Sequence, residues 1–519
     1  GLATFRATAA AAPPAVVEAA ARRLEAAAAS PPVGAGPPPP PTVVESDTYR
    51  LEFDGTSGLL STITNRKSGA TTSLAVEWGW YNSSVGGCTA YGADVPVSAR
   101  LPPCDDQKSG AYIFRPNSST FFYPGAPATP TVEVVKGNLV TEVHQKFSPW
   151  ASHVVRLYEG RAYVEVEWTA GPIPDDTPWF PAVAHDKKNA SRPLPNRWGK
   201  EVVVRYSSGL KSAGTFYTDS NGKEMVKRVY NQRGPSYPHP YNISEPVAGN
   251  YYPVNALISL DDGTHELTVL TDVSQAGASL ADGSLELMVH RRLQDDDSRG
   301  VQEPLNETMC GCNDVGADPG KMGAHGHEGD GGCECAGLTV RGRHWLIFDE
   351  IPAAHATRRE ISEALNFPPL VALTPAAAPP RAPSKSALSK ALPPNVKLVT
   401  LTSNYAATHG GQLLLRLSHL YQAGEHPTLA TPVTVNLEEV FGEAGLKITA
   451  ATETTLTANR PAAAADAAKH AWTTHAPNAA VAAQLAEVKA KAYEEKVPFA
   501  YPSVTLRPME VRTFLASFA

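Results

Sequence analysis

The sequence predicts an all-β protein, with a large antiparallel sandwich followed by a smaller β domain. From Val43 onward, short segments alternate apolar and polar residues with a period of two, and Gly, Asn and Asp separate these segments. The dipeptide Asn221-Gly222 lies between two such segments, and both central positions of a type I′ hairpin turn need positive φ. Many short strands with closely spaced turns are typical of a large sandwich.

Residues 1–42 are dominated by Ala and Pro and include five consecutive prolines, Pro37–Pro41. A run of this kind is stiff and extended and cannot form a packed core. Residues 15–29 could form a short helix, but they lack a sufficient apolar stripe. We therefore interpret residues 1–42 as a linker.

The first β domain is predicted over residues 43–372. In the segment YRLEF (49–53) the three apolar side chains point one way and the two charged ones the other, and Asp54-Gly55 then turns the chain. The segment YVEVEW (163–168) has the same period of two. These segments are expected to be strands with one face in a core.

A second linker is predicted at 373–394, where Ala, Pro, Ser and Lys replace the strand pattern. Beyond it, a smaller β domain is expected over 395–519, because three further segments read as strands: 396–401, 413–417 and 511–515. An Ala-rich stretch at 461–492 interrupts this domain and is expected to be a partly helical excursion on the surface.

Composition excludes some classes of function. The formal net charge is −7 and the isoelectric point is near 6.1. The chain therefore lacks the excess of Lys and Arg that is typical of proteins that bind nucleic acid. No run of 18 or more apolar residues is present, and we expect no membrane span. The chain begins with Gly1 without a signal peptide, so we interpret it as a fragment or a processed chain.

Cysteines and glycosylation sequons both favour the secretory pathway. The six cysteines fall in two regions, and local disulfides in an oxidising compartment are the expected use. These disulfide candidates are Cys88, Cys104, Cys310, Cys312, Cys333 and Cys335. Five Asn-x-Ser/Thr sequons would suit the same route if they lie in exposed loops. These glycosylation candidates are Asn82, Asn117, Asn189, Asn242 and Asn306.

The loop between Cys310 and Cys335 also contains His325 and His327. Thiolates and imidazoles suit zinc or copper, and a loop of this length could surround one ion. The Cys-x-Cys spacing differs from that of most structural zinc sites, however, and the sequon at Asn306 implies an oxidising lumen. Disulfides, a metal site and free thiols therefore remain three alternatives for this loop.

Three consecutive carboxylates, Asp295, Asp296 and Asp297, raise the question of glycosidic chemistry. Retaining hydrolysis normally uses two carboxyl groups about 5 Å apart. Consecutive side chains point in different directions, however, and Arg291, Arg292 and Arg299 flank this run. We therefore expect a salt-linked structural loop, with direct acid/base work as the alternative.

Six segments of the chain resemble one enzyme family. They read SGAYIFRPN (109–117), FYTDSNG (216–222), EPVAGNYYPVN (245–255), DGSLELMVH (282–290), RRLQDDDSRG (291–300) and PMEVRTFLA (508–516). Together they resemble the C-terminal half of the lysosomal-type α-mannosidases, glycoside hydrolase family 38, over most of residues 43–519. Two departures are a longer link at 175–198 and an expanded cysteine-bearing loop at 310–335, which has no inherited role.

The resemblance implies a galactose-mutarotase-like supersandwich at 43–372 that packs against an N-terminal catalytic α/β domain. It also implies zinc-dependent, retaining hydrolysis of terminal α-mannose in N-glycans or other oligosaccharides, in a lysosome, in a vacuole or outside the cell. In the family, the zinc ligands and the nucleophile belong to the N-terminal half. We therefore expect no catalytic or metal-binding residue in this segment, and we expect the isolated chain to be inactive.

Two residues are expected to contact the mannose ring. The family uses the tyrosine of Ser-Gly-Ala-Tyr and the arginine of Asp-Asp-x-Arg-Gly, which correspond to Tyr112 and Arg299. A phenol offers a hydrogen bond and an apolar wall, and a guanidinium can grip two adjacent hydroxyls. The alternative is that Tyr112 packs in the core of a strand at 112–114 and Arg299 merely closes a surface loop.

A second hypothesis for the whole chain is a non-catalytic carbohydrate-binding or scaffolding β-sandwich. Fold alone does not separate this hypothesis from the first, because function depends on sites built on a fold. Half of an enzyme should expose a large contiguous apolar face where the other half docks, and a binding module should not.

Overall fold

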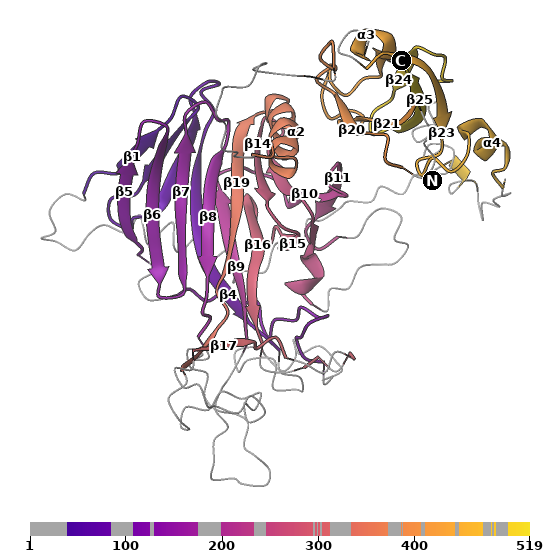
Figure 1. Cartoon of the computed structure of the whole chain (residues 1–519). Helices are drawn as coiled ribbons and strands as arrows, with labels where there is room; N and C mark the ends of the chain where they lie inside the picture. The colour runs from indigo at the N-terminus through magenta and orange to yellow at the C-terminus, as the bar shows by residue number, and fades with distance from the viewer. Residues whose placement is uncertain are drawn as a thin grey trace, which may run out of the picture. The chain divides into compact units, whose positions relative to one another are not determined.

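Antiparallel strands are the main regular structure in the part of the chain that the computed structural model describes (Figure 1). Apart from a few isolated positions, the described residues are 39–84, 107–124, 129–174, 199–232, 245–293, 296–297, 299–300, 304–311, 334–371, 388–405, 411–441, 446–470 and 497–519. The chain divides into two compact units between Asn366 and Phe367. In the described residues, no helix is long and apolar enough to cross a membrane.

One sheet of the first unit has eight strands. In spatial order they are β1 (Thr42–Glu45), β2 (Tyr49–Phe53), β3 (Leu60–Asn65), β4 (Thr71–Asn82), β9 (Lys200–Ser208), β16 (Ser284–Arg292), β15 (Gln275–Ala278) and β12 (Tyr252–Val254). All neighbouring pairs are antiparallel. Strands that are distant in sequence, β4, β9 and β16, therefore lie side by side in the middle.

The other sheet has nine antiparallel strands. In spatial order they are β11 (Glu224–Val229), β10 (Thr215–Ser220), β13 (Leu257–Asp261), β14 (His265–Thr271), β19 (Val340–Glu350), β8 (Val164–Ala170), β7 (Ala151–Tyr158), β6 (Val140–Ser148) and β5 (Thr131–Lys136). Residues 221–223 join β10 to β11, and in this turn Asn221 and Gly222 have φ values of 57° and 75°. The predicted hairpin turn is therefore confirmed.

The two sheets enclose one continuous hydrophobic core. Alternate residues of each strand point into it, as the period of two predicts. In β8, Val164, Val166 and Trp168 are buried in the core, while Glu165 and Glu167 lie on the opposite face. In β9, Val202 and Val204 occupy the same core.

The helix α2 (Ala353–Asn366) covers part of the nine-stranded sheet, where it packs against β14 and β19 (Figure 1). Its buried Arg358 binds both carboxylate oxygens of Glu266 at 2.8 and 2.7 Å, and His355 binds the same carboxylate at 3.0 Å. Burial alone would raise the pKa of Glu266, but these two partners outweigh it and lower the pKa to about 2.

The second unit is a smaller β domain. Its four-stranded sheet has the order β20 (Val396–Thr402), β21 (Gln412–His419), β25 (Val511–Phe518), β23 (Ile448–Thr454), and β22 (Val433–Asn436) pairs with β24 (Ser503–Leu506). The short helices are α3 (Leu437–Phe441) and α4 (Ala462–Ala467). Leu415, Leu417 and Phe514 are fully buried in its separate core. The all-β prediction, with a large sandwich and a smaller β domain, is thus confirmed.

Candidate functional site

Three of the family-like segments, 109–117, 282–290 and 291–300, meet at the face of the eight-stranded sheet that points away from the core. We call this the outer face of the eight-stranded sheet, formed by β4, β9 and β16. Phe114 and Phe121 pack against Tyr81 of this face, and the backbone groups of Trp80 and Phe122 exchange two hydrogen bonds of 3.0 Å along the edge of β4. The ring of Phe121 lies against Gly79, where an added Cβ atom would be 2.2 Å from it. Glycine is needed at 79 because the covering segment approaches so closely.

A buried ion pair clamps the loop formed by residues 109–115. Arg291 of β16 pairs with Glu201 of β9 at 2.6 Å, and Glu201 is 0% exposed. The same guanidinium donates hydrogen bonds to the carbonyl oxygens of Gly110 and Ile113 at 2.9 and 3.0 Å. Charge-assisted bonds of this kind are roughly twice as strong as neutral ones, so the loop is held firmly against the sheet.

Ser109 and Gly110 have specific structural reasons to be where they are. The Ser109 hydroxyl donates to the Glu201 carboxylate at 2.5 Å and accepts the backbone N–H of Arg115 at 3.1 Å. A Cβ atom at position 110 would lie 2.4 Å from the Cβ atom of Asp297. Since real Cβ atoms do not approach so closely, a side chain at 110 would displace Asp297.

Asp297 brings the two predicted sugar-binding residues together. One carboxylate oxygen accepts the backbone N–H of Tyr112 at 2.8 Å, and the other accepts the backbone N–H of Arg299 at 3.0 Å. The Arg299 side chain also donates from Nε to the Gln107 side-chain oxygen at 2.8 Å. Tyr112 and Arg299, 187 positions apart in sequence, therefore meet at one buried carboxylate that is 2% exposed.

Tyr112 points into solvent, since 69% of its surface is exposed. It lies in a bend and not in a strand, so the alternative that Tyr112 packs in the core of a strand at 112–114 is wrong. Arg299 also lies in a bend, at the surface. The structure thus places both side chains at one accessible location; their contact with a sugar stays a prediction.

We expected Asp297 to form salt bridges with the flanking arginines, and this expectation is wrong. Arg291 binds Glu201, and Arg292 donates to the Asn306 side chain at 2.6 Å. Asp297 instead accepts backbone N–H groups, as described above. Asp295 lies outside the described residues. The structural interpretation of Asp297 therefore holds, but its partners are peptide groups, which sequence spacing did not reveal.

A second buried carboxylate, Glu286 of β16, organises the aromatic part of the outer face. It accepts hydrogen bonds from the hydroxyls of Tyr81 and Tyr251 at 2.9 and 2.5 Å, and it binds Arg205 at 2.6 Å. The Arg205 guanidinium lies 3.8 Å from the centre of the Phe121 ring. Burial, and then the charge of Glu286, raise the pKa of both tyrosines well above the usual value. These phenols therefore stay protonated and serve as donors.

Beside this cluster the surface forms an open groove of about 600 Å³. It lies between the loop formed by residues 109–115 and the strands β12, β15 and β16 at one end of the sheet. Its principal lining side chains are Phe114, Tyr251, Tyr252, Gln275, His290 and Arg291. Phe114 and Arg291 also belong to the clamped loop and its anchor, so the groove adjoins the Tyr112 region.

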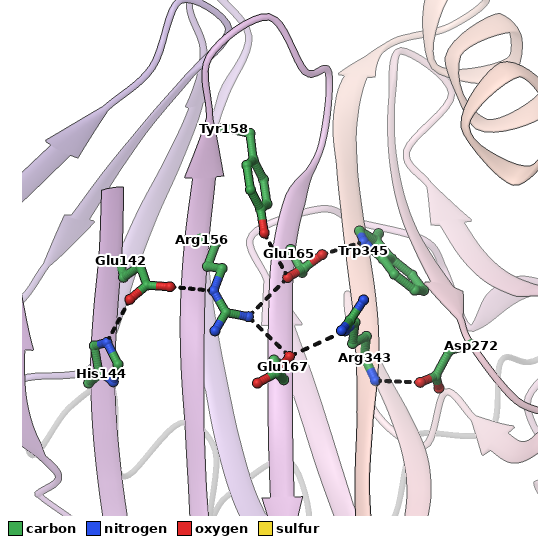
Figure 2. A network of polar contacts seen from close by, with 9 residues as sticks. All are labelled: Glu142, His144, Arg156, Tyr158, Glu165, Glu167, Asp272, Arg343 and Trp345. Carbon is green, nitrogen blue, oxygen red and sulfur yellow. Dashed lines mark hydrogen bonds and ion pairs between the residues drawn. The ribbon is translucent and has the colours of Figure 1, made fainter. Parts of the chain in front are cut away.

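A different polar cluster covers the outer face of the nine-stranded sheet (Figure 2). Its centre is Arg156 of β7, which binds Glu142 at 2.6 Å, Glu165 at 3.0 Å and Glu167 at 3.2 Å. Trp345 also donates to Glu165, at 3.0 Å. Each of these carboxylates is thus engaged by a fixed partner.

Glu142 of this cluster does not suit general-acid catalysis. Hydrogen bonds from Arg156 and His144 lower the pKa of Glu142, whereas a general acid needs a raised pKa. Arg343 extends the cluster through Glu167 at 3.2 Å, and its backbone N–H donates to Asp272 at 3.0 Å (Figure 2). We interpret this cluster as a stabilising cross-strand network.

The five predicted glycosylation sites have different surroundings. Asn82 and Asn117 are 1% and 5% exposed, so the expectation of exposed loops is wrong for them. A glycan cannot be attached to side chains so enclosed without opening the structure. Asn306 is partly exposed. Asn189 and Asn242 lie outside the described residues.

Two of the six cysteines lie in paired strands. Cys310 of β17 (Thr308–Gly311) is directly opposite Cys335 of β18 (Glu334–Gly337). Directly opposite Cα atoms in an antiparallel pair are about 4.5–5.5 Å apart, a separation that a disulfide can span. The sequence left the pairing of these cysteines open, and their use in disulfides stays a prediction. The remaining predicted residues lie outside the described part of the chain: Cys88, Cys104, Cys312, Cys333, His325 and His327.

The chemistry of zinc does not fit the described part of this chain. Among the described residues, no group of three or more His, Cys, Asp or Glu side chains is placed to hold a metal ion. The buried carboxylates of the outer face, Glu201, Glu286 and Asp297, already bind arginines, hydroxyls or peptide N–H groups. No step of a reaction is therefore assigned to a metal in this segment.

Comparison with known proteins defines the class. Residues 44–299 match the glycosyl hydrolases family 38 C-terminal domain, and residues 395–514 match the C-terminal beta sandwich domain of the same family. The two matches include the loop formed by residues 109–115, Asp297, Arg299 and most of the smaller unit. The chain thus contains the C-terminal domains of a glycoside hydrolase family.

The relatives are more specific. Human lysosomal alpha-mannosidase is 39% identical over 484 residues, which cover 91% of this chain and 39% of that protein. The alpha-mannosidase of Canavalia ensiformis is 34% identical over 482 residues, covering 90% of this chain and 41% of that protein. The chain belongs to glycoside hydrolase family 38 and matches the C-terminal part of these alpha-mannosidases. It spans about two fifths of the length of these relatives.

Solved structures were also found. An α-mannosidase from Enterococcus faecalis aligns with 91% of this chain and 42% of its own, at 13% identity and a TM-score of 0.48. A galactose mutarotase-like protein from Lactobacillus casei aligns with 60% of this chain and 100% of its own, at 10% identity and a TM-score of 0.26.

Proposed function

We propose that this chain is the C-terminal portion of a zinc-dependent, retaining α-mannosidase that removes terminal α-mannose from N-glycans or other oligosaccharides. Tyr112 and Arg299 would complete the sugar-binding pocket, and an N-terminal catalytic α/β domain would supply the rest. The observation that carries the proposal is the shared Asp297 carboxylate, which holds the exposed Tyr112 and Arg299 at one place on the surface.

The chemistry of the two side chains suits a mannose ring. A phenol has a polar hydroxyl and an apolar face, which match the hydroxyls and the C–H face of a sugar. The guanidinium of Arg299 offers several donors in one plane, so it can bind two adjacent hydroxyls or orient a carboxylate of the catalytic domain. Both groups bind and orient the substrate; neither is a nucleophile here.

The nucleophile and the acid/base must then come from the N-terminal domain. Retaining hydrolysis uses two carboxyl groups about 5 Å apart, and one of them must be free to attack the anomeric carbon. Glu201, Glu286 and Asp297 are buried and bound to other groups. Zinc, held by the N-terminal domain, would orient substrate hydroxyls. The isolated chain is accordingly expected to be inactive.

The relatives named lysosomal alpha-mannosidase support a secretory route that ends in a lysosome, in a vacuole or outside the cell. The cysteines and the partly exposed sequon at Asn306 suit the same route. Mapping of peptides by mass spectrometry, with and without reduction, would identify a bridge between Cys310 and Cys335.

The second hypothesis, a carbohydrate-binding or scaffolding module without catalysis, predicts no large apolar docking face. The exposed large apolar side chains among the described residues are spread over many segments of the sequence, in both units. They include Tyr112, Leu139, Val273, Leu370 and Leu456. The experiment below separates the two hypotheses.

The test is the hydrolysis of p-nitrophenyl α-mannoside by the full-length protein that contains this chain. Tyr112→Phe should lower kcat/KM about 3- to 10-fold, and Arg299→Lys about 10- to 100-fold, because a neutral and a charge-assisted hydrogen bond to the sugar are weakened. Tyr158→Phe and Arg343→Lys are matched controls on the nine-stranded sheet and should stay within about twofold of wild type.

Two results would contradict this proposal. Unchanged kinetics in the Tyr112 and Arg299 variants would remove both residues from the pocket. Binding of mannose oligosaccharides by the full-length protein without any hydrolysis would favour the non-catalytic hypothesis instead.

A further inference from the structure

We propose that Asp297 is a positioning residue, which sets the places of both Tyr112 and Arg299 relative to the sugar. This inference rests on the proposed function, because it concerns the same pocket. Asp297 itself would not touch the substrate, since it is buried and both of its carboxylate oxygens are bound to the protein.

The geometry couples the two sugar-binding residues. The Tyr112 N–H and the Arg299 N–H bind different oxygens of one rigid carboxylate, at 2.8 and 3.0 Å. Gln107 links Asp297 to the Arg299 side chain. Its side-chain nitrogen donates to the Asp297 carbonyl oxygen at 3.1 Å, and its side-chain oxygen accepts from Arg299. A shift of Asp297 would therefore move Tyr112 and Arg299 together.

The Asp297 side chain has little freedom to turn. Gly110 packs directly against it, and a Cβ atom at 110 would lie 2.6 Å from the nearer carboxylate oxygen. Gly110 is held in turn by Arg291, through its carbonyl oxygen at 2.9 Å. A binding residue is held in place when the residue behind it is fixed by both packing and hydrogen bonds. Asp297 is fixed in both ways behind Tyr112 and Arg299.

The chemistry requires a carboxylate at 297. Two peptide N–H groups point at this side chain, so it must present two acceptors. An aspartate does so, whereas an asparagine presents one acceptor and one donor. Asp297→Asn therefore keeps the shape of the side chain. Its NH2 group then faces a peptide N–H group, so one of the two hydrogen bonds is lost.

Asp219 provides a matched control. Its buried carboxylate also accepts backbone N–H groups, from Ala256 at 2.8 Å on one oxygen and from Gly222 at 2.7 Å on the other. It belongs to β10 and orders the β10–β11 hairpin. Asp219→Asn therefore removes the same kind of bond at a position that supports neither Tyr112 nor Arg299.

The experiment measures kcat/KM and thermal unfolding of the full-length protein. Asp297→Asn should lower kcat/KM about 10- to 100-fold, because a displacement of about 1 Å has an effect of this size. Asp219→Asn should lower the melting temperature but leave kcat/KM of the folded enzyme within about twofold of wild type. Gly110→Ala is a second variant, which displaces Asp297 by contact and should act like Asp297→Asn.

Non-additivity distinguishes positioning from general damage. Tyr112→Phe should lower kcat/KM by a smaller factor in the Asp297→Asn variant than in wild type, because the phenol is already misplaced in that variant. The inference is overturned if Tyr112→Phe has the same effect in both backgrounds, or if Asp297→Asn leaves kcat/KM within about twofold of wild type.

Amide hydrogen exchange gives a readout that does not depend on activity. In the full-length protein, the amides of Tyr112 and Arg299 should exchange at least about tenfold faster in Asp297→Asn than in wild type, as expected when a buried bond opens. If exchange changes but no form of the protein hydrolyses mannosides, the proposed function fails and the structural coupling stands. If Tyr112 and Arg299 variants lose activity but Asp297→Asn does not, the positioning role alone fails.

Discussion

Glu201 and Asp297 illustrate how single buried carboxylates order a loop that carries no regular secondary structure. Glu201 holds Ser109 and, through Arg291, two carbonyl oxygens of the loop. Asp297 holds the N–H of Tyr112. Donors and acceptors of the loop are thus satisfied from opposite sides, which fixes a bend that would otherwise be free to move.

Glu201→Gln is expected to destabilise the first unit strongly. It leaves the half-buried Arg291 without its charge partner, and breaking a buried pair in this way typically costs about 3–5 kcal/mol, which is the upper limit here. Denaturant unfolding followed by tryptophan fluorescence would measure this loss.

Glu45→Gln is the control for this prediction, because Glu45 pairs with Arg50 at 3.1 Å on the surface of the same unit. Loss of an exposed pair costs about 1 kcal/mol or less. Equal losses for the two variants would show that the Glu201 pair does not support the fold.

At the scale of strands and loops, local patterning predicted the sheets well. Alternation in 49–53 and 163–168 reports which side chains enter a core, and these segments are β2 and most of β8. Asn221-Gly222 predicts its turn because few residues tolerate its backbone angles. Such signals depend on neighbouring residues alone.

The contacts that build the site depend on residues far apart in the chain. The bond between Tyr112 and Asp297 spans 185 positions, and the one between Tyr81 and Glu286 spans 205. The order of the sheets and their registers decide such contacts, and no local pattern encodes them. The family resemblance could therefore name Tyr112 and Arg299, but not the carboxylate that joins them.

Two histidines are buried between the sheets. His153 accepts the indole N–H of Trp78 at 3.1 Å and contacts Gln145 at 2.7 Å, while His344 lies 2.7 Å from the Tyr206 hydroxyl. Burial lowers the pKa of each imidazole to about 3. Both are therefore neutral in the folded protein over the physiological range.

This burial predicts that the first unit loses stability in mild acid. Between about pH 6.5 and 3 the unfolded chain binds a proton at each histidine and the folded chain does not, so stability falls as pH falls through this window. At pH 5 the loss is about 2 kcal/mol for each histidine relative to pH 7. The contribution of Glu266, whose folded pKa is about 2, is lost only below about pH 4.5.

Denaturant unfolding of wild type and His153→Gln at pH 7 and pH 5 would measure the effect. Gln keeps an acceptor for Trp78 and removes one titrating group, so the loss between the two pH values should be about half that of wild type. An identical loss in both proteins would mean that His153 does not titrate on unfolding.

For the whole molecule, the proposed function requires that this chain works together with an N-terminal catalytic domain. It offers Tyr112 and Arg299 on its surface, and its carboxylates at the outer face of the eight-stranded sheet are already occupied. The purified chain should therefore give no turnover of p-nitrophenyl α-mannoside, at any pH between about 4 and 7. Turnover by the chain alone would show that it contains its own nucleophile.

The most direct test is a crystal structure of the full-length protein with a bound mannose analogue. We expect the Tyr112 hydroxyl and the Arg299 guanidinium both to lie within about 3.2 Å of sugar oxygens, a normal hydrogen-bond distance. Asp297 should still bind the two backbone N–H groups behind them. A sugar bound away from both residues, with Tyr112 still in solvent, would exclude Tyr112 and Arg299 from the sugar-binding pocket.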